Sequence, residues 1–108
     1  MKVYSESGKS FVEWTIHSDE QVDGDDYQYP VIEGVFTDKG ERRQGIATRL
    51  LRETIAEIAK EWNLVYIVAE PFERNISVED LVDFYEKMGF SVDDEKTGTS
   101  VILCMTGI

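Results

Sequence analysis

A short basic stretch surrounds a glycine, in an arrangement that suits the binding of an anion. Between Lys39 and Arg52 the chain carries five bases and one acid, a net charge of +4, although the whole chain carries −11. The apolar spacing after Gly45 predicts a helix, and the first turn of a helix presents unpaired N–H groups and positive dipole charge. Glycine has no Cβ, so an anion could approach the backbone closely there. We interpret the stretch as a phosphate site, although a solvated helix face would account for the same charge.

The other residues that could do chemistry are few. Neither G-x-x-x-x-G-K-[ST] nor a full G-x-G-x-x-G is present, which disfavours nucleotide hydrolases and dinucleotide-binding enzymes. The chain has one cysteine, Cys104, and one histidine, His17. Cys104 lies in an apolar run and is interpreted as a small buried hydrophobe, and His17 has no partner at a recognisable spacing. We therefore expect no internal disulfide and no metal site.

The part of the chain before the basic stretch reads as strands. β-Forming residues predict strands over residues 2–5 and 10–17. Residues 18–29 are acidic and contain a glycine, so they are predicted to be a loop or a hairpin tip. A third strand is predicted after Pro30, over residues 31–37, and would lead directly into the basic stretch.

The remainder alternates helices and strands. Apolar spacings of three and four predict an amphipathic helix of about 17 residues from Gly45. The apolar run over residues 64–69 predicts a strand buried on both faces. Ser77 opens a second helix with a capping box, which Gly89 would end. Two further strands close the chain, over residues 90–92 and 99–105. The order β-β-β-α-β-α-β-β predicts one α/β domain over residues 1–108, with a mixed central sheet and two main helices.

Composition excludes several classes of protein. Apolar residues make up 42% and aromatic residues 11%, which is enough for a core and excludes wholesale disorder. The net charge of −11 argues against direct nucleic-acid binding, because phosphate backbones select basic surfaces. No apolar run is long enough to span a bilayer, and the N-terminus lacks a signal core. We therefore expect a cytoplasmic protein without membrane contact.

Two motifs resemble a known family. Residues 42–47, RRQGIA, match the R/Q-x-x-G-x-G/A motif of the GNAT superfamily of acyl-CoA-dependent N-acetyltransferases, with alanine as a permitted last residue. Residues 83–90, DFYEKMGF, resemble the LYEKLGF segment of that family. The motifs occur in the family's order, on the expected elements, with a predicted buried strand between them. The predicted elements over residues 31–106 also follow the family core, so the resemblance implies a GNAT-like fold.

The resemblance implies that acetyl-CoA is the co-substrate. In the family, the strand before the first motif pairs its backbone with the pantetheine arm, as an extended ligand completes a strand edge. This role falls on Val35, Phe36 and Thr37. The 3′-phosphate is expected near one of three arginines, Arg42, Arg43 or Arg49. The pyrophosphate would be held by the loop and the first helical turn, at Arg42, Arg43, Gln44, Gly45, Ile46, Ala47 and Thr48.

The resemblance also implies two residues for acid–base chemistry. Glu33 stands where many members have a carboxylate that acts as base, directly or through water. Strand alternation predicts that Glu33, Val35 and Thr37 share one face. Tyr85 falls on the family's tyrosine, whose hydroxyl acts as general acid toward the sulfur. Two plainer interpretations stay open: Glu33 as a solvent-facing strand residue, and Tyr85 as part of the core.

Three functions are open on the sequence. The first is an N-acetyltransferase acting on a primary amine; the second is a non-catalytic module that binds CoA or inhibits a basic partner; the third is a structural domain with a chance motif. The presence of both Glu33 and Tyr85 favours the enzyme. Outside the basic stretch the charge is −15, which would attract a cationic acceptor such as a protein lysine, although solubility explains it equally.

The short N-terminal part bears on the acceptor. Many members have a pair of helices after the first strand that shapes the acceptor site, and this chain has only a short acidic segment there. We therefore expect a reduced acceptor site, or one completed by a second subunit in a homodimer. The segments RRQGI and ISVEDLVDFYEKMGF also look similar to small phage-encoded acetyltransferases of the anti-CRISPR type, which modify a lysine of a bacterial effector.

Overall fold

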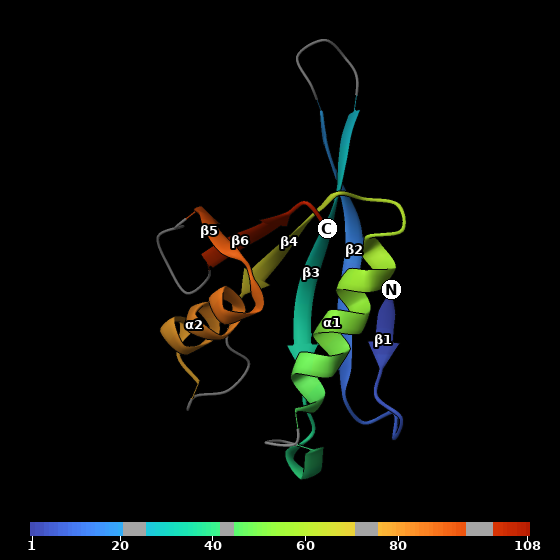
Figure 1. Ribbon diagram of the computed structural model, residues 1–108, viewed down its shortest axis with the longest axis vertical. Coiled ribbons are helices and arrows are strands. Elements are labelled where there is room, and N and C mark those ends of the chain that lie inside the picture. The colour runs from blue at the N-terminus through green and yellow to red at the C-terminus, as the bar shows by residue number, and fades with distance from the viewer. Residues whose placement is uncertain (21–25, 42–44, 71–75, 95–100) are drawn as a thin grey trace.

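The computed structural model describes residues 1–20, 26–41, 45–70, 76–94 and 101–108 (Figure 1). Within them, six strands form one sheet in the order β1-β2-β3-β4-β6-β5, and the β3–β4 pair alone is parallel. The predicted α/β fold, with a mixed sheet and two main helices, is confirmed. The elements are β1 (Lys2–Tyr4), β2 (Phe11–Glu20), β3 (Asp26–Phe36), the 3-10 turn η1 (Lys39–Glu41), α1 (Ile46–Ile58), β4 (Leu64–Ala69), α2 (Val78–Met88), β5 (Ser91–Asp94) and β6 (Val101–Thr106).

β2 and β3 form a hairpin arm that extends well beyond the body of the molecule (Figure 1). Their register continues to the Glu20↔Asp26 pair. Of the two predictions for residues 18–29, a loop or a hairpin tip, the described part bears out the hairpin, whose paired strands reach into this segment; β3 therefore begins before Pro30 rather than after it. The acidic composition suggested a loop, but Tyr27 and Tyr29 favour a strand and gain cross-strand partners in the hairpin.

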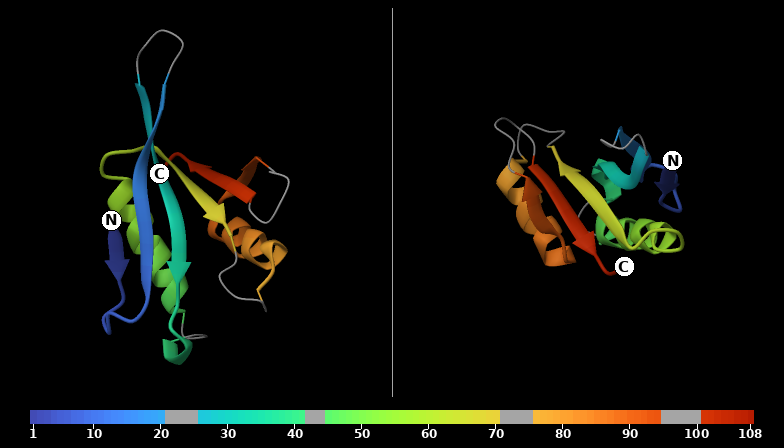
Figure 2. Two further views of the ribbon diagram at one scale, coloured as in Figure 1. Left: turned by 180° about the vertical axis from the view of Figure 1, so that it is seen from behind. Right: turned by 90° about the horizontal axis from the view of Figure 1, so that it is seen from above.

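Both helices pack on the same face of the sheet, α1 over the β1–β3 half and α2 over the β4–β6 half. Ile32, Ile67 and Leu103 are successive partners across β3, β4 and β6, so they point to one side, and all three are fully buried. Seen from behind, the strands lie in front of the helices (Figure 2, left). The helices complete this core with Leu50, Leu51, Ile58 and Tyr85.

The opposite face of the sheet is not covered by any described helix. β4 shows the difference: Val65, Ile67 and Ala69 are fully buried under the helices, whereas its other three side chains are only half-buried. The prediction that this strand is buried on both faces is therefore wrong. We call the uncovered side the open face. Trp14 is buried in the core, and Trp62 packs against it.

α1 is shorter than predicted. It has 13 residues, because after Ile58 the chain tightens into i→i+3 hydrogen bonds, from the N–H of Lys60 to Glu57 and from that of Glu61 to Ile58. It is nevertheless the longest helix in the described ranges. None of the helices in those ranges is long and apolar enough to cross a membrane.

α2 begins and ends as predicted. The side chain of Ser77 accepts a hydrogen bond from the N–H of Asp80 at 3.1 Å. Gly89 ends the helix with a φ of 113°, a left-handed conformation that glycine adopts at little cost. Lys87 in the last turn and two acids in the first turn complement the helix dipole. These caps fix the orientation of the helix that carries Tyr85.

Replacement of Ser77 by alanine should lower the free energy of unfolding by about 1 kcal/mol, because the N–H of Asp80 loses its acceptor. Urea denaturation followed by circular dichroism measures the change. Ser77→Asp keeps an acceptor at the cap and should restore the stability of the unmodified chain. Equal stability of the alanine variant and the unmodified chain would show that the cap contributes nothing.

Candidate active site

β3 and β4 run side by side for only a short distance. Their parallel register joins Val31 to Tyr66 and Ile32 to Ile67, and it includes no later pair of described residues. Beyond this point the two strands diverge, and the sheet opens as a V (Figures 1 and 2). The backbone of residues 33–36 therefore has no β4 partner for its polar groups, and an unpaired strand edge can accept an extended ligand.

A β-bulge in β3 decides which way its side chains point. The register with β2 passes directly from Gly34 to Ile32, so Glu33 is an extra residue on β3. The prediction that Glu33 and Val35 share a face is wrong for this reason. Val35 packs against the core, whereas the side chain of Glu33 is exposed on the open face. Thr37 lies beyond the end of the strand and is half-buried.

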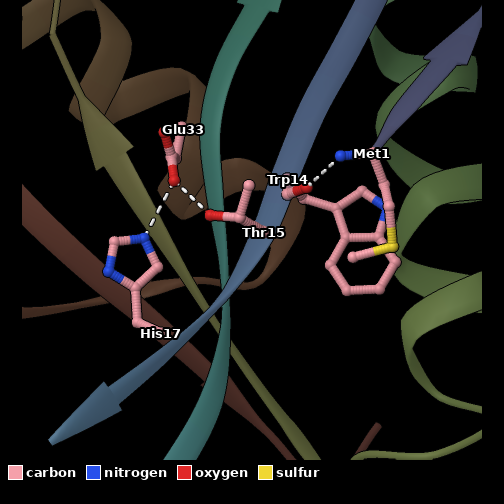
Figure 3. A network of polar contacts seen from close by, with 5 residues as sticks. All are labelled: Met1, Trp14, Thr15, His17 and Glu33. Carbon is pink, nitrogen blue, oxygen red and sulfur yellow. Dashed lines mark hydrogen bonds and ion pairs between the residues drawn. The ribbon is translucent and has the colours of Figure 1, made fainter.

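Two side chains of β2 hold the carboxylate of Glu33 (Figure 3). The hydroxyl of Thr15 donates a hydrogen bond to Oε1, and Nε2 of His17 donates to the same oxygen at 2.8 Å. No described residue donates to Oε2, which leaves that oxygen for an amine or a water. The side chains of His17 and Glu33 are 45% and 43% exposed. The interpretation of His17 as a residue without a partner is therefore wrong.

The hydrogen bonds keep Glu33 ionised. The bond from Thr15, followed by that from His17, holds the pKa of Glu33 below its ordinary value of 4.5. The carboxylate can therefore accept a proton throughout the neutral range. Because the pKa is lowered on folding, Glu33 stabilises the fold above the ordinary carboxyl pKa, and this contribution is lost as the pH falls through the lowered value.

The N-terminus of α1 is open in a way that the N-terminus of α2 is not. Gly45 occupies the N-cap of α1 with a φ of 75°, no side chain caps it, and the first turn contains no acid. A Cβ on Gly45 would meet no described atom within 4 Å. α2 instead begins with the Ser77 cap and two acids. The first N–H groups of α1 therefore suit an anion, as predicted from the sequence.

The predicted cofactor residues fall into two groups. Arg42, Arg43 and Gln44 lie outside the described residues. The others lie at the β3 edge and in the first turn of α1. At the end of β3, Phe36 is 39% exposed and stacks on Phe11, with ring centroids 5.4 Å apart. Nε of Arg49 lies 3.8 Å from a carboxylate oxygen of Glu53 on the exposed side of α1. The cofactor roles of all these residues stay predictions. The described members of the set are Val35, Phe36, Thr37, Gly45, Ile46, Ala47 and Thr48.

Tyr85 lies on the buried side of α2. It is 3% exposed, and its ring meets those of Phe84 and Phe90 at centroid distances of 5.6 and 6.2 Å. Burial raises the pKa of Tyr85 to about 12, so the phenol keeps its proton at neutral pH, as a general acid must. Its hydroxyl makes no hydrogen bond to a described residue. Tyr85 thus lies under the helix-covered face, and Glu33 lies on the open face.

Cys104 is a poor candidate for a nucleophile. It is half-buried in β6. Burial, and then the carboxylate of Asp93, raise the pKa of its thiol, so the reactive thiolate is scarce at neutral pH. Its interpretation as a small hydrophobe rather than a nucleophile is supported, although the side chain is half-buried and not fully buried as predicted.

Comparison with known families decides where this arrangement belongs. The model of the acetyltransferase (GNAT) domain family matches residues 10–92, which is most of the chain. The chain belongs to the GNAT family. The motifs at residues 42–47 and 83–90 both lie within the matched range, so the resemblance seen in the sequence is confirmed. No curated protein matches the sequence.

The GNAT chain is also similar to several solved structures. The anti-CRISPR protein AcrVA5 is 27% identical with a TM-score of 0.65, over 94% of this chain and 95% of that one. The PaiA N-acetyltransferase of Thermoplasma acidophilum, solved with coenzyme A, is 20% identical with a TM-score of 0.67. The match covers 95% of this chain and 57% of the PaiA chain. The NatC complex bound to Gag peptide and CoA is 16% identical with a TM-score of 0.67, over 94% and 62%. This GNAT chain therefore spans less than two thirds of the matched PaiA and NatC chains.

Thr15 and His17 are the site residues of this GNAT chain that the sequence analysis missed. They lie 18 and 16 residues before Glu33, so no local motif joins them to it. The one available signal was their alternation on a strand predicted to neighbour the strand of Glu33. That signal becomes a contact only when the hairpin register and the bulge are known.

Proposed function

We propose that this GNAT chain is an N-acetyltransferase that moves an acetyl group from acetyl-CoA to a primary amine, on a protein lysine or a small cationic molecule. The observation that carries the proposal is the parting of β3 from β4 after Ile32 and Ile67. The parted sheet has an ionised carboxylate, Glu33, on one face and a protonated phenol, Tyr85, under the other. A purely structural domain needs neither the unpaired edge nor these two groups.

Acetyl-CoA fits the groups that this part of the fold presents. Its pantetheine arm would pair with the β3 edge at Val35, Phe36 and Thr37, and its pyrophosphate would accept hydrogen bonds from the first turn of α1. The absence of a Cβ at Gly45 leaves room for a phosphate. The PaiA and NatC structures contain CoA, and their likeness to this chain supports the same co-substrate.

The two ionisable residues supply the proton transfers. Glu33 would take the proton that the amine must lose before it attacks the thioester carbonyl, directly or through a water. As the new C–N bond forms and the C–S bond breaks, Tyr85 would give its proton to the leaving thiolate. The ammonium nitrogen loses two protons, one to Glu33 before the attack and one as the amide forms. The sulfur gains one from Tyr85, whose phenol is then reprotonated, and the remaining proton leaves Glu33 for solvent, so the charges balance. Because the amine attacks the thioester directly, Cys104 has no part in the reaction.

The acceptor is proposed to be cationic. Glu33 lies on the open face of a chain whose charge outside the basic stretch is −15, and such a surface raises the local concentration of ammonium groups. The cytoplasmic location, the homodimer and the extent of the domain over residues 1–108 stay predictions.

Two measurements on the full chain test the function. Calorimetry with acetyl-CoA tests the co-substrate, and a thiol-release assay with a panel of amines tests the transfer. Binding together with turnover of one amine class supports the enzyme. Binding without turnover of any amine would indicate the non-catalytic module, and no binding at millimolar acetyl-CoA would overturn both.

Gly45→Ala should weaken the binding of acetyl-CoA by about tenfold, because the new methyl group intrudes where the phosphate approaches the backbone. Calorimetry measures the dissociation constant. Gly8→Ala is a matched control: Gly8 has the same φ of 75°, and a Cβ there also meets no described atom within 4 Å. Both variants should lose about 1 kcal/mol of stability from backbone strain. Equal affinities of the two variants for acetyl-CoA would show that the phosphate does not bind at Gly45.

A further inference from the structure

A row of aromatic side chains lies on the open face, along the hairpin arm and onto β4. Tyr27 stacks on Tyr29 with ring centroids 5.7 Å apart, and Tyr29 stacks on His17 at 5.9 Å. Tyr66 of β4 meets Tyr29 edge-on at 5.3 Å. Tyr27 is 43% exposed and His17 45%. We call Tyr27, Tyr29, His17 and Tyr66 the aromatic row.

The aromatic row ends at the carboxylate proposed as the base. His17 is both a ring of the row and the donor of the 2.8 Å hydrogen bond to Glu33 (Figure 3). Tyr27 is therefore connected to Glu33 through only two intervening side chains, those of Tyr29 and His17. A ligand that lies along the row would reach Glu33 at its end.

The sequence that carries half of the aromatic row is acidic. Residues 18–29, which include Tyr27 and Tyr29, contain five acids and no base. At the other end of the row, burial, then Cys104 and then Asp93, raise the pKa of Tyr66, which places a further carboxylate in its surroundings. Ring faces next to carboxylates attract ammonium and guanidinium groups, through the ring quadrupole and through charge.

A second aromatic group on the same face already contacts a cation of the chain itself. The ring of Phe11 meets that of Tyr4 at a tilt, with centroids 5.8 Å apart, and stacks on that of Phe36 at 5.4 Å. Nζ of Lys2 already lies 4.7 Å from the ring centroid of Phe11. The chain therefore supplies its own cation to this group, and the group makes a good control for the aromatic row.

We propose that the aromatic row is the docking surface for a lysine- and arginine-rich segment of a polypeptide acceptor, whose target lysine then reaches Glu33. The proposal rests on the function proposed above and narrows its acceptor from any primary amine to a lysine within a basic polypeptide. Tyr27 and Tyr29 are two residues apart on one strand, which is also the side-chain repeat of an extended peptide. A basic residue of such a peptide can therefore meet the exposed ring of Tyr27, and the residue two positions along lies over Tyr29, nearer to Glu33.

The test uses the full chain and two synthetic peptides of equal length. Each peptide has one central lysine, flanked in one by arginine, which is not acetylated, and in the other by serine. Thiol release gives kcat/KM for each. We expect kcat/KM to be higher for the arginine-flanked peptide by about two- to fivefold, from contact with the exposed ring of Tyr27, and this difference to shrink as salt is added.

Variants locate the effect on the aromatic row. Tyr27→Ala should raise KM for the arginine-flanked peptide by about two- to fivefold. Tyr27→Phe keeps the ring and should keep the preference for the arginine-flanked over the serine-flanked peptide. Tyr4→Ala removes an exposed ring from the second aromatic group and should leave both peptides unaffected. Circular dichroism checks that each variant is folded.

The outcomes separate the docking surface from the proposed function. Equal kcat/KM for the two peptides, with turnover of both, would overturn the docking surface and leave the acetyltransferase intact. If no amine is turned over, fluorescence anisotropy of the arginine-flanked peptide still decides: binding that Tyr27→Ala weakens supports the docking surface, and no binding overturns it. A dimer that Tyr27→Ala dissociates would show that a second copy covers the row, which also overturns the proposal.

Discussion

Tyr85→Phe should lower kcat by about a hundredfold while the protein stays folded, because removing the hydroxyl removes the acid that protonates the leaving thiolate. The phenol of Tyr85 is protonated well beyond neutral pH, since burial raises its pKa to about 12. Its hydroxyl makes no hydrogen bond to a described residue, so its loss leaves no described group unsatisfied and costs little stability. Steady-state kinetics by thiol release measure kcat. Calorimetry with acetyl-CoA checks that the variant is folded and still binds the co-substrate.

The comparison that gives this result its meaning is Tyr4→Phe. Tyr4 also carries a phenol, but it is 54% exposed and lies in β1, outside the proposed site. We expect its variant to keep both kcat and acetyl-CoA affinity. If Tyr85→Phe also keeps kcat, Tyr85 is a core residue of α2 and the general acid is another group.

Glu33→Gln should lower kcat/KM by about a hundredfold at neutral pH, the low end of the effect of a general base. The low end is expected because the hydrogen bonds from Thr15 and His17 lower the pKa of Glu33 and make it a weaker base. The deficit should shrink as the pH rises toward the ordinary lysine pKa of about 10.4, where the acceptor amine loses its proton without help. A pH profile of kcat/KM for both proteins measures this.

Two further variants test the assignment of Glu33. Glu13→Gln changes a second acid of the same hairpin, one on β2 that is paired with Gly34 and forms no hydrogen bond with Thr15 or His17 in the described structure, and it should keep full activity. Thr15→Val removes the largest cause of the lowered pKa, so the acid limb of the profile should move to higher pH. If Glu33→Gln lowers kcat/KM by the same factor at every pH, the Glu33 side chain positions other groups and moves no proton.

Elements governed by local chemistry could be predicted from the sequence. The cap of α2 needs only Ser77 and an N–H three residues later, and its end needs only a glycine that accepts positive φ. The amphipathic spacing after Gly45 predicted the helix, and the motif around Gly45 pointed to the family that the domain match then showed. Of the loop or hairpin tip expected over residues 18–29, the hairpin formed, because cross-strand pairing overrode an acidic composition.

The sequence by itself determined the order of the elements, the caps of α2, the family and the concentration of positive charge around the start of α1. The tertiary structure decided which groups meet. The bulge at Glu33 turned the carboxylate away from the face of Val35, and the hairpin register brought Thr15 and His17 to it from 18 and 16 residues away. The physical reason is that strand register is set by long-range pairing, and one extra residue reverses the direction of every later side chain.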